Sequence, residues 1–152
     1  MLNLSSLNKR IKIFSSLSWI NKKLILEVLL YSAIARFVIL IIPFRKYRKY
    51  LGRHNEETPL ESDKEEHKTI KQVQWAITGV CSHTPWESKC LVQAIIAQKI
   101  LKKRNIHSTL YLGVNKDRSN KILAHAWLRS GLIFVTGGYN KNEYVEVGRF
   151  AN

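Results

Sequence analysis

The hydrophobic pattern of this chain changes after residue 105, and the change limits the folds that the chain can adopt. Before that point, apolar residues recur three and four positions apart, which is the spacing of one face of an α-helix. After it, apolar and β-branched residues alternate with polar ones, which is typical of strands. Helices followed by an antiparallel sheet indicate an α+β fold. Strands are expected at residues 108–114, 122–129, 132–136 and 144–150.

Two helices are expected in the first half of the chain. Residues 22–42 form the first. Residues 63–78 form the second, with Ser62 or Asp63 as its N-terminal cap and Gly79 at its C-terminal end.

A third helix ends near residue 103, and its start has two readings. Thr84 can cap it, Pro85 suits its first position, and Glu87 completes a capping box with Thr84. A second start at Ser88 is also compatible with the sequence, and the pattern does not decide between them.

Charge divides the 152 residues into three regions. The chain has 25 Lys and Arg against 11 Asp and Glu, a formal net charge of +14. Residues 1–54 form a basic helical region, residues 55–62 an acidic polar linker, and residues 63–152 the expected core domain. The positive electrostatic field of such a chain attracts nucleic acid, anionic lipid or acidic peptide. No nucleic-acid-binding motif accompanies the charge, so we expect no nucleic acid partner.

Residues 24–44 form an apolar stretch about as long as a bilayer is thick. Arg36 near its middle would cost roughly 2.5–3.5 kcal/mol in a membrane span, and Glu27 adds to that cost. We therefore expect a buried helix first, contact with a membrane surface or a partner second, and a span last.

The two cysteines, Cys81 and Cys90, do not suggest a disulfide framework. Their close spacing around Pro85 makes a bridge between them unfavourable. We expect free thiols and a cytoplasmic location.

Cys90 is the candidate nucleophile. A thiolate is favoured near a helix N-terminus, where unpaired N–H groups and the helix dipole stabilise negative charge. Cys90 lies in the first turn if the helix begins at Ser88, and deeper if it begins at Thr84.

His125 is the candidate general base and acid, because it lies among small and apolar residues in the second expected strand. A turn at Ser130-Gly131 would place His125 opposite Thr136, which could then accept a hydrogen bond from the imidazole. Asn140 is a second candidate for that role. Glu87 is either the capping partner described above or part of the surroundings of Cys90 and His125.

Four segments carry a resemblance to a known family: residues 88–94 around Cys90, residues 110–114, the run Ala124-His125-Ala126-Trp127-Leu128, and residues 135–138. Together, over residues 70–150, they resemble the leader peptidase of lasso-peptide biosynthesis. This is a transglutaminase-like, microcin-processing cysteine protease of bacteria.

The resemblance implies a papain-like core in which Cys90 is the nucleophile and His125 the base. It implies three partners: a precursor peptide with its leader, a PqqD-like leader-recognition protein, and an asparagine-synthetase-like macrolactam synthetase. It implies no cofactor. The family usually has an acidic third residue on the strand after the histidine, whereas Thr136-Gly137-Gly138 has no carboxylate. The third role then falls to Thr136, Asn140, Glu87 or a backbone carbonyl.

Three other functions compete with the peptidase. Cys81, His83, Cys90 and His125 offer metal ligands, but their spacing matches no common zinc pattern, so no metal is expected. A non-catalytic basic module for nucleic acid or anionic membrane would explain the charge. An acyl transferase would use the same Cys90 and His125.

Overall fold

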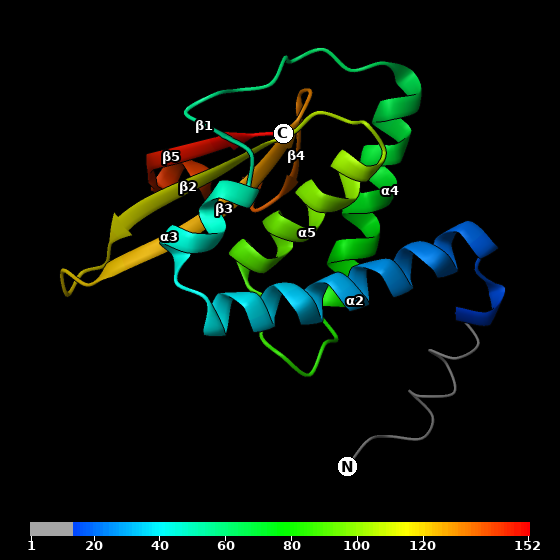
Figure 1. The fold of residues 1–152 in the computed structure, drawn as a ribbon, viewed down its shortest axis with the longest axis horizontal. Helices are drawn as coiled ribbons and strands as arrows, with labels where there is room; N and C mark the ends of the chain where they lie inside the picture. The colour runs from blue at the N-terminus through cyan, green and yellow to red at the C-terminus, as the bar shows by residue number, and fades with distance from the viewer. Residues whose placement is uncertain (1–13) are drawn as a thin grey trace.

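The computed structural model describes residues 14–152, in which helices cover one face of a five-stranded sheet (Figure 1). Helix α5 lies across the strands, α4 packs beside it, and α2 packs against both helices. One hydrophobic core contains residues from all three helices and from the sheet. The arrangement confirms the α+β prediction.

The strands form the order β1-β5-β2-β3-β4, and every neighbouring pair is antiparallel. The four expected C-terminal strands are all present, with ends shifted by one or two residues. Strand β1 was not expected, because two residues are too short for a pattern and are held only by pairing with β5. The strands are β1 Arg53–His54, β2 Thr109–Lys116, β3 Ile122–Ser130, β4 Ile133–Thr136 and β5 Val145–Ala151.

The helices confirm the expected ones in number and approximate place. Two short helical segments, α3 and η1, follow α2, and a third, η2, precedes β5. The bounds are α2 Trp19–Ile41, α3 Phe44–Tyr47, η1 Arg48–Tyr50, α4 Lys64–Cys81, α5 Cys90–Lys103 and η2 Gly138–Glu143.

Helix α4 begins as expected but ends later. Asp63 caps it, and Glu66 returns the hydrogen bond to the Asp63 N–H, which makes a capping box. Gly79 does not end the helix, because its backbone stays helical and the helix continues to Cys81. A glycine ends a helix when it adopts a positive φ, and Gly79 does not.

Helix α5 begins at Cys90, so the start expected at Thr84 is wrong. The Thr84 hydroxyl bonds to the Cys81 and Trp86 carbonyls and lies 2.9 Å from the Ser88 hydroxyl. These local bonds hold residues 82–89 as a loop rather than as the first turn of a helix.

The turn between β3 and β4 is also displaced from the expected one. Ser130 pairs with Ile133, so Gly131 and Leu132 form the turn. Gly131 has φ +55° at the first central position, which is where a II′ hairpin turn requires glycine. A shift in register then places Thr136 opposite Leu128, and the expected pairing of Thr136 with His125 is wrong.

Candidate active site

Cys90 is the first residue of α5 and is half-buried against the core. The preceding residue, Lys89, has an extended backbone, and its side chain makes no capping hydrogen bond. The N–H groups of the first turn are therefore left without a side-chain cap. This is a site that stabilises negative charge on a thiolate or on an oxygen placed beside Cys90.

Two side-chain hydrogen bonds hold the loop before Cys90. Gln93 donates from its side chain to the Ser88 carbonyl at 2.8 Å, which ties α5 back to the loop. Trp86 donates from its indole nitrogen to the Ser32 hydroxyl of α2 at 3.2 Å. The position of Cys90 thus depends on α2 as well as on α5.

His125 lies on β3 and is 7% exposed. Its Nε2 atom lies 2.8 Å from the carbonyl oxygen of Gly137. A carbonyl oxygen only accepts hydrogen bonds, so Nε2 carries the proton and donates it. In the neutral ring, Nδ1 then holds the free lone pair and is the basic atom.

Gly137 can present this carbonyl because it has no side chain. Its φ is +65°, in the left-handed region that other residues rarely adopt. A Cβ atom there would lie 2.4 Å from the Ala126 carbonyl oxygen and 3.1 Å from His125 Nε2. The glycine therefore allows the close approach that orients the imidazole.

Aromatic rings enclose the imidazole. The ring centroid of Tyr144 lies 4.8 Å from that of His125, that of Trp127 lies 5.9 Å away in a stacked arrangement, and that of Tyr139 lies 6.3 Å away. These contacts limit rotation of the ring.

The side chains expected to orient His125 do not bond to it. The Thr136 Oγ1 and Asn140 Oδ1 atoms are buried, and each lacks a hydrogen-bond partner within residues 14–152. Glu87 forms ion pairs of 2.9 Å with Arg36 and with Lys89. The Lys89 ammonium, with Arg36 beside it, holds the pKa of Glu87 below its ordinary value.

The faces of the sheet separate Cys90 from His125. Successive residues of a strand point to opposite faces. Ala126 and Leu128 belong to the core beneath α5, so His125 leaves β3 on the other face. Among the described residues, the only side-chain hydrogen bond of His125 is that to Gly137, and none joins it to Cys90.

Beside His125, the edge of β3 is covered by Gly137 and not by a strand. Strand β4 ends at Thr136, opposite Leu128, so no strand pairs with His125 on that side. Gly137 lies against this edge, close to the Ala126 carbonyl and the Trp127 Cβ atom. The imidazole therefore contacts the chain at Gly137, just beyond the last residue of β4.

Comparison with known protein families identifies the domain. A family model described as the transglutaminase-like superfamily matches residues 38–149. The chain belongs to the transglutaminase-like superfamily. This superfamily commonly includes cysteine peptidases and acyltransferases. No curated protein and no solved structure matches the chain.

The matched part of this transglutaminase-like domain includes both Cys90 and His125, and it begins within α2. Between residues 14 and 152, no group of three or more His, Cys, Asp or Glu side chains is arranged to hold a metal ion. Both cysteines are free thiols.

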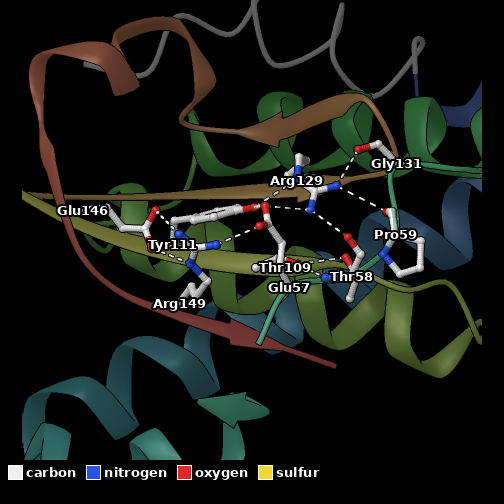
Figure 2. A network of polar contacts seen from close by, with 9 residues as sticks. All are labelled: Glu57, Thr58, Pro59, Thr109, Tyr111, Arg129, Gly131, Glu146 and Arg149. Atoms are coloured by element: carbon white, nitrogen blue, oxygen red, sulfur yellow. Dashed lines mark hydrogen bonds and ion pairs between the residues drawn. The ribbon is translucent and has the colours of Figure 1, made fainter. Parts of the chain in front are cut away.

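A polar network that the sequence pattern did not predict surrounds Arg129 (Figure 2). It lies on the same face of the sheet of this transglutaminase-like domain as His125. Arg129 is 5% exposed, and its guanidinium donates to the Tyr111 hydroxyl, to Glu57, and to the carbonyls of Thr58, Pro59 and Gly131. These bonds tie residues 57–59 to β3.

The network connects to the imidazole through stacked rings. Tyr111 stacks on Trp127 at 5.5 Å between centroids, and Trp127 stacks on His125. Burial raises the pKa of Tyr111, and its hydrogen bond to Glu57 raises it further. Arg129 therefore supports the His125 surroundings through two intervening rings. The sequence feature that could have pointed to this network is an arginine, Arg129, within a strand whose neighbouring residues are apolar.

Proposed function

We propose that this protein is a cysteine peptidase that removes the leader from a lasso-peptide precursor. The observation that carries the proposal is the position of Cys90 at the first residue of α5, inside a transglutaminase-like domain. The motifs around Cys90 and His125 support the finer assignment, because they resemble those of leader peptidases. A papain-like arrangement of cysteine on a helix and histidine on a strand belongs to the same proposal.

The proposed reaction begins at Cys90. His125 accepts the thiol proton at Nδ1, and the thiolate attacks the carbonyl carbon of the last leader residue. The carbonyl oxygen becomes an oxyanion, which accepts hydrogen bonds from N–H groups at the start of α5. The imidazolium then protonates the departing amine, which is the new N-terminus of the core peptide.

The second half of the reaction releases the leader. The leader remains attached to Cys90 as a thioester, and His125 takes a proton from an attacking water. The tetrahedral intermediate expels the Cys90 thiolate, which recovers a proton from His125. In the structure the Gly137 carbonyl keeps Nε2 protonated, which leaves Nδ1 as the nitrogen for both proton transfers.

The mechanism requires His125 and Cys90 to approach one another when substrate binds. Catalytic hydrogen bonds are often long before substrate binds and tighten in the complex. To turn toward α5, the imidazole has to leave its contacts with Gly137 and with the surrounding rings. Residues 137–144 enclose the ring through Tyr139 and Tyr144, so this segment must adjust.

The proposed partners follow from the reaction. A leader-recognition protein of the PqqD-like type would present the leader, and an asparagine-synthetase-like enzyme would close the macrolactam on the released amine. The reaction would take place in the cytoplasm, where precursors are synthesised and where free thiols persist.

Precursor cleavage tests the proposal. The protein is incubated with a lasso precursor and its leader-recognition protein, and the products are identified by mass spectrometry. We expect one cleavage between leader and core for the wild type, and none for Cys90→Ala or His125→Ala. The matched control is Cys81→Ala, which removes the other thiol and should retain cleavage.

Cleavage that persists in folded Cys90→Ala would contradict the proposal. So would the absence of cleavage by the wild type with both its precursor and its recognition protein present. Capture of the thioester by an added amine instead of water would favour the acyl transferase.

A further inference from the structure

Helix α2 has an apolar face that no other described element covers. Its opposite side packs into the core through Leu24, Val28 and Ala35. The uncovered face is formed by six large residues, here called the apolar stripe, whose exposed fractions lie between 49% and 76%. They are Trp19, Leu26, Leu30, Ile34, Phe37 and Ile41.

Glu27 and Arg36, the charged residues within the span from Leu26 to Ile41, are paired with other elements. Glu27 is turned toward α5, where it pairs with Lys103 at 3.0 Å and with Arg104 at 2.9 Å. Arg36 pairs with Glu87 of the loop before α5. Residues 14–54 contain no acidic side chain besides Glu27, so the surface around the stripe holds no free carboxylate of its own segment.

A basic groove adjoins the C-terminal end of the stripe. This groove, of about 650 Å³, is lined by Val38 and Ile42 of the α2 end and by Arg45, Lys46 and Lys49 of the segment that follows. Tyr47 and Tyr50 complete its walls. Lys23, which is exposed, adds a cation near the other end of α2. Cations therefore stand at both ends of an uninterrupted apolar surface.

We propose that α2 binds the surface of an anionic phospholipid bilayer. The stripe enters the boundary between headgroups and acyl chains, and the basic groove receives lipid phosphates. An in-plane helix of this kind carries large apolar residues on one side and cations that meet anionic lipid. The helix lies on the membrane rather than across it, because its other face is packed against α4 and α5 (Figure 1).

The charge pattern favours a lipid surface over a second copy of the chain. A second copy would bring its own cations to the same face, and like charges would repel. A bilayer with anionic headgroups supplies negative charge at its plane and an apolar interior beneath. This arrangement of the bilayer matches the exposed surface of α2, which has cations at its two ends and the apolar stripe between them.

Vesicle flotation tests the proposal and needs no peptidase activity, so its outcome is independent of the proposed function. The full chain is floated with vesicles of phosphatidylcholine alone, or of phosphatidylcholine with phosphatidylglycerol. We expect flotation with the anionic vesicles, less with the neutral ones, and weaker binding at higher salt. Leu30→Ser and Phe37→Ser should each weaken binding roughly tenfold or more. Each of Arg45→Gln, Lys46→Gln and Lys49→Gln should weaken it about fivefold.

Matched controls separate these effects from general loss of hydrophobicity or charge. Leu132→Ser changes an apolar residue that is 75% exposed in the turn between β3 and β4, and it should leave binding unchanged. Lys116→Gln, Arg118→Gln and Lys121→Gln remove the same number of cations from the hairpin between β2 and β3. Circular dichroism confirms that each variant is folded.

Three results would overturn the proposal. One is the absence of flotation with anionic vesicles by the folded wild type. Another is equal loss of binding in the stripe and control variants. The third is a dimer in solution that Leu30→Ser abolishes while vesicle binding is absent, which would identify α2 as an interface between copies.

Discussion

The Nε2 atom of His125 lies 2.8 Å from the carbonyl oxygen of Gly137, and no side chain of residues 14–152 takes the orienting role. A backbone carbonyl fixes the tautomer as a carboxylate would, but it carries no charge to stabilise an imidazolium. The site therefore depends on the path of the chain at Gly137, where the φ is +65°.

Gly137→Ala should disturb this relationship. The added Cβ atom would clash with the Ala126 carbonyl and crowd Nε2, so the His125 bond should be lost. We expect kcat for leader cleavage to fall roughly a hundredfold or more. Nitrogen NMR of the His125 ring checks the cause, because the wild type should hold one tautomer and the variant a mixture.

Gly79→Ala is the matched control. Nothing lies within 4 Å of the Cβ that it adds in α4, and the backbone there is helical. It should leave the cleavage rate unchanged and stabilise the fold by roughly 0.4–1 kcal/mol. Loss of activity in this variant would show that glycine replacements act through general disturbance rather than at His125.

The two cysteines should differ in reactivity. Burial raises the pKa of the Cys81 thiol, although a hydrogen bond with Ser88 acts in the opposite direction. Cys90 is less buried and stands at the start of α5. Iodoacetamide at neutral pH should therefore modify Cys90 first, as measured by peptide mass mapping. Preferential modification of Cys81 in the folded protein would contradict the placement of the two thiols.

Glu27 should stabilise the attachment of α2 in a pH-dependent way. Burial alone would raise its pKa, but hydrogen bonds and charges from Arg104 and Lys103 outweigh this, and the pKa lies below 4.5. A carboxyl whose pKa is lowered by folding contributes stability above its unfolded value, and loses it as the pH falls through the folded value. Glu27→Gln should lower the free energy of unfolding by roughly 1 kcal/mol at neutral pH.

Urea unfolding of wild type and Glu27→Gln at several pH values measures this effect. The difference between them should shrink as the pH falls below 4.5, because the wild-type carboxyl becomes protonated. A difference that stays constant into acid would show that the ion pairs with Lys103 and Arg104 contribute nothing.

Arg129→Lys should destabilise the sheet despite keeping the charge. A lysine cannot reproduce the planar set of donors that binds Tyr111, Glu57 and the three carbonyls. We expect a loss of roughly 2 kcal/mol or more in thermal or urea unfolding. Arg149→Lys, on a residue whose side chain is 34% exposed, should cost less than about 1 kcal/mol. Equal effects of the two substitutions would contradict the clamping role of Arg129.

The periodicity of apolar residues was sufficient to predict the α+β order, the long helices and the four C-terminal strands. It did not locate β1, because its two residues are ordered only by pairing with the distant β5. It also left the start of α5 open between Thr84 and Ser88, and the helix begins at Cys90, close to the second of these. The Thr84-Pro85-Trp86-Glu87 run satisfies the local rules for a helix start, but side-chain bonds of Thr84 within the loop prevail over them.

The candidate site was predictable in part. Cys90 and His125 could be selected by residue type and neighbours. The orienting group could not be selected in the same way, because a carbonyl is present at every position and only the fold at Gly137 distinguishes it. The hairpin register that suggested Thr136 differs from the observed one in two ways. The turn is displaced by one residue, and a register shift between Leu128 and Arg129 pairs Thr136 with Leu128, on the other face from His125.

The acyl-enzyme is the most direct test of the central claim that Cys90 and His125 form an acyl-transfer pair. Wild-type protein is mixed with precursor and recognition protein, quenched within the first turnover, and measured by intact and peptide mass. We expect a leader-sized thioester on Cys90 in the wild type, absent from Cys90→Ala and greatly reduced in His125→Ala. Leader cleavage without any adduct on Cys90, or an adduct formed equally well in His125→Ala, would contradict it.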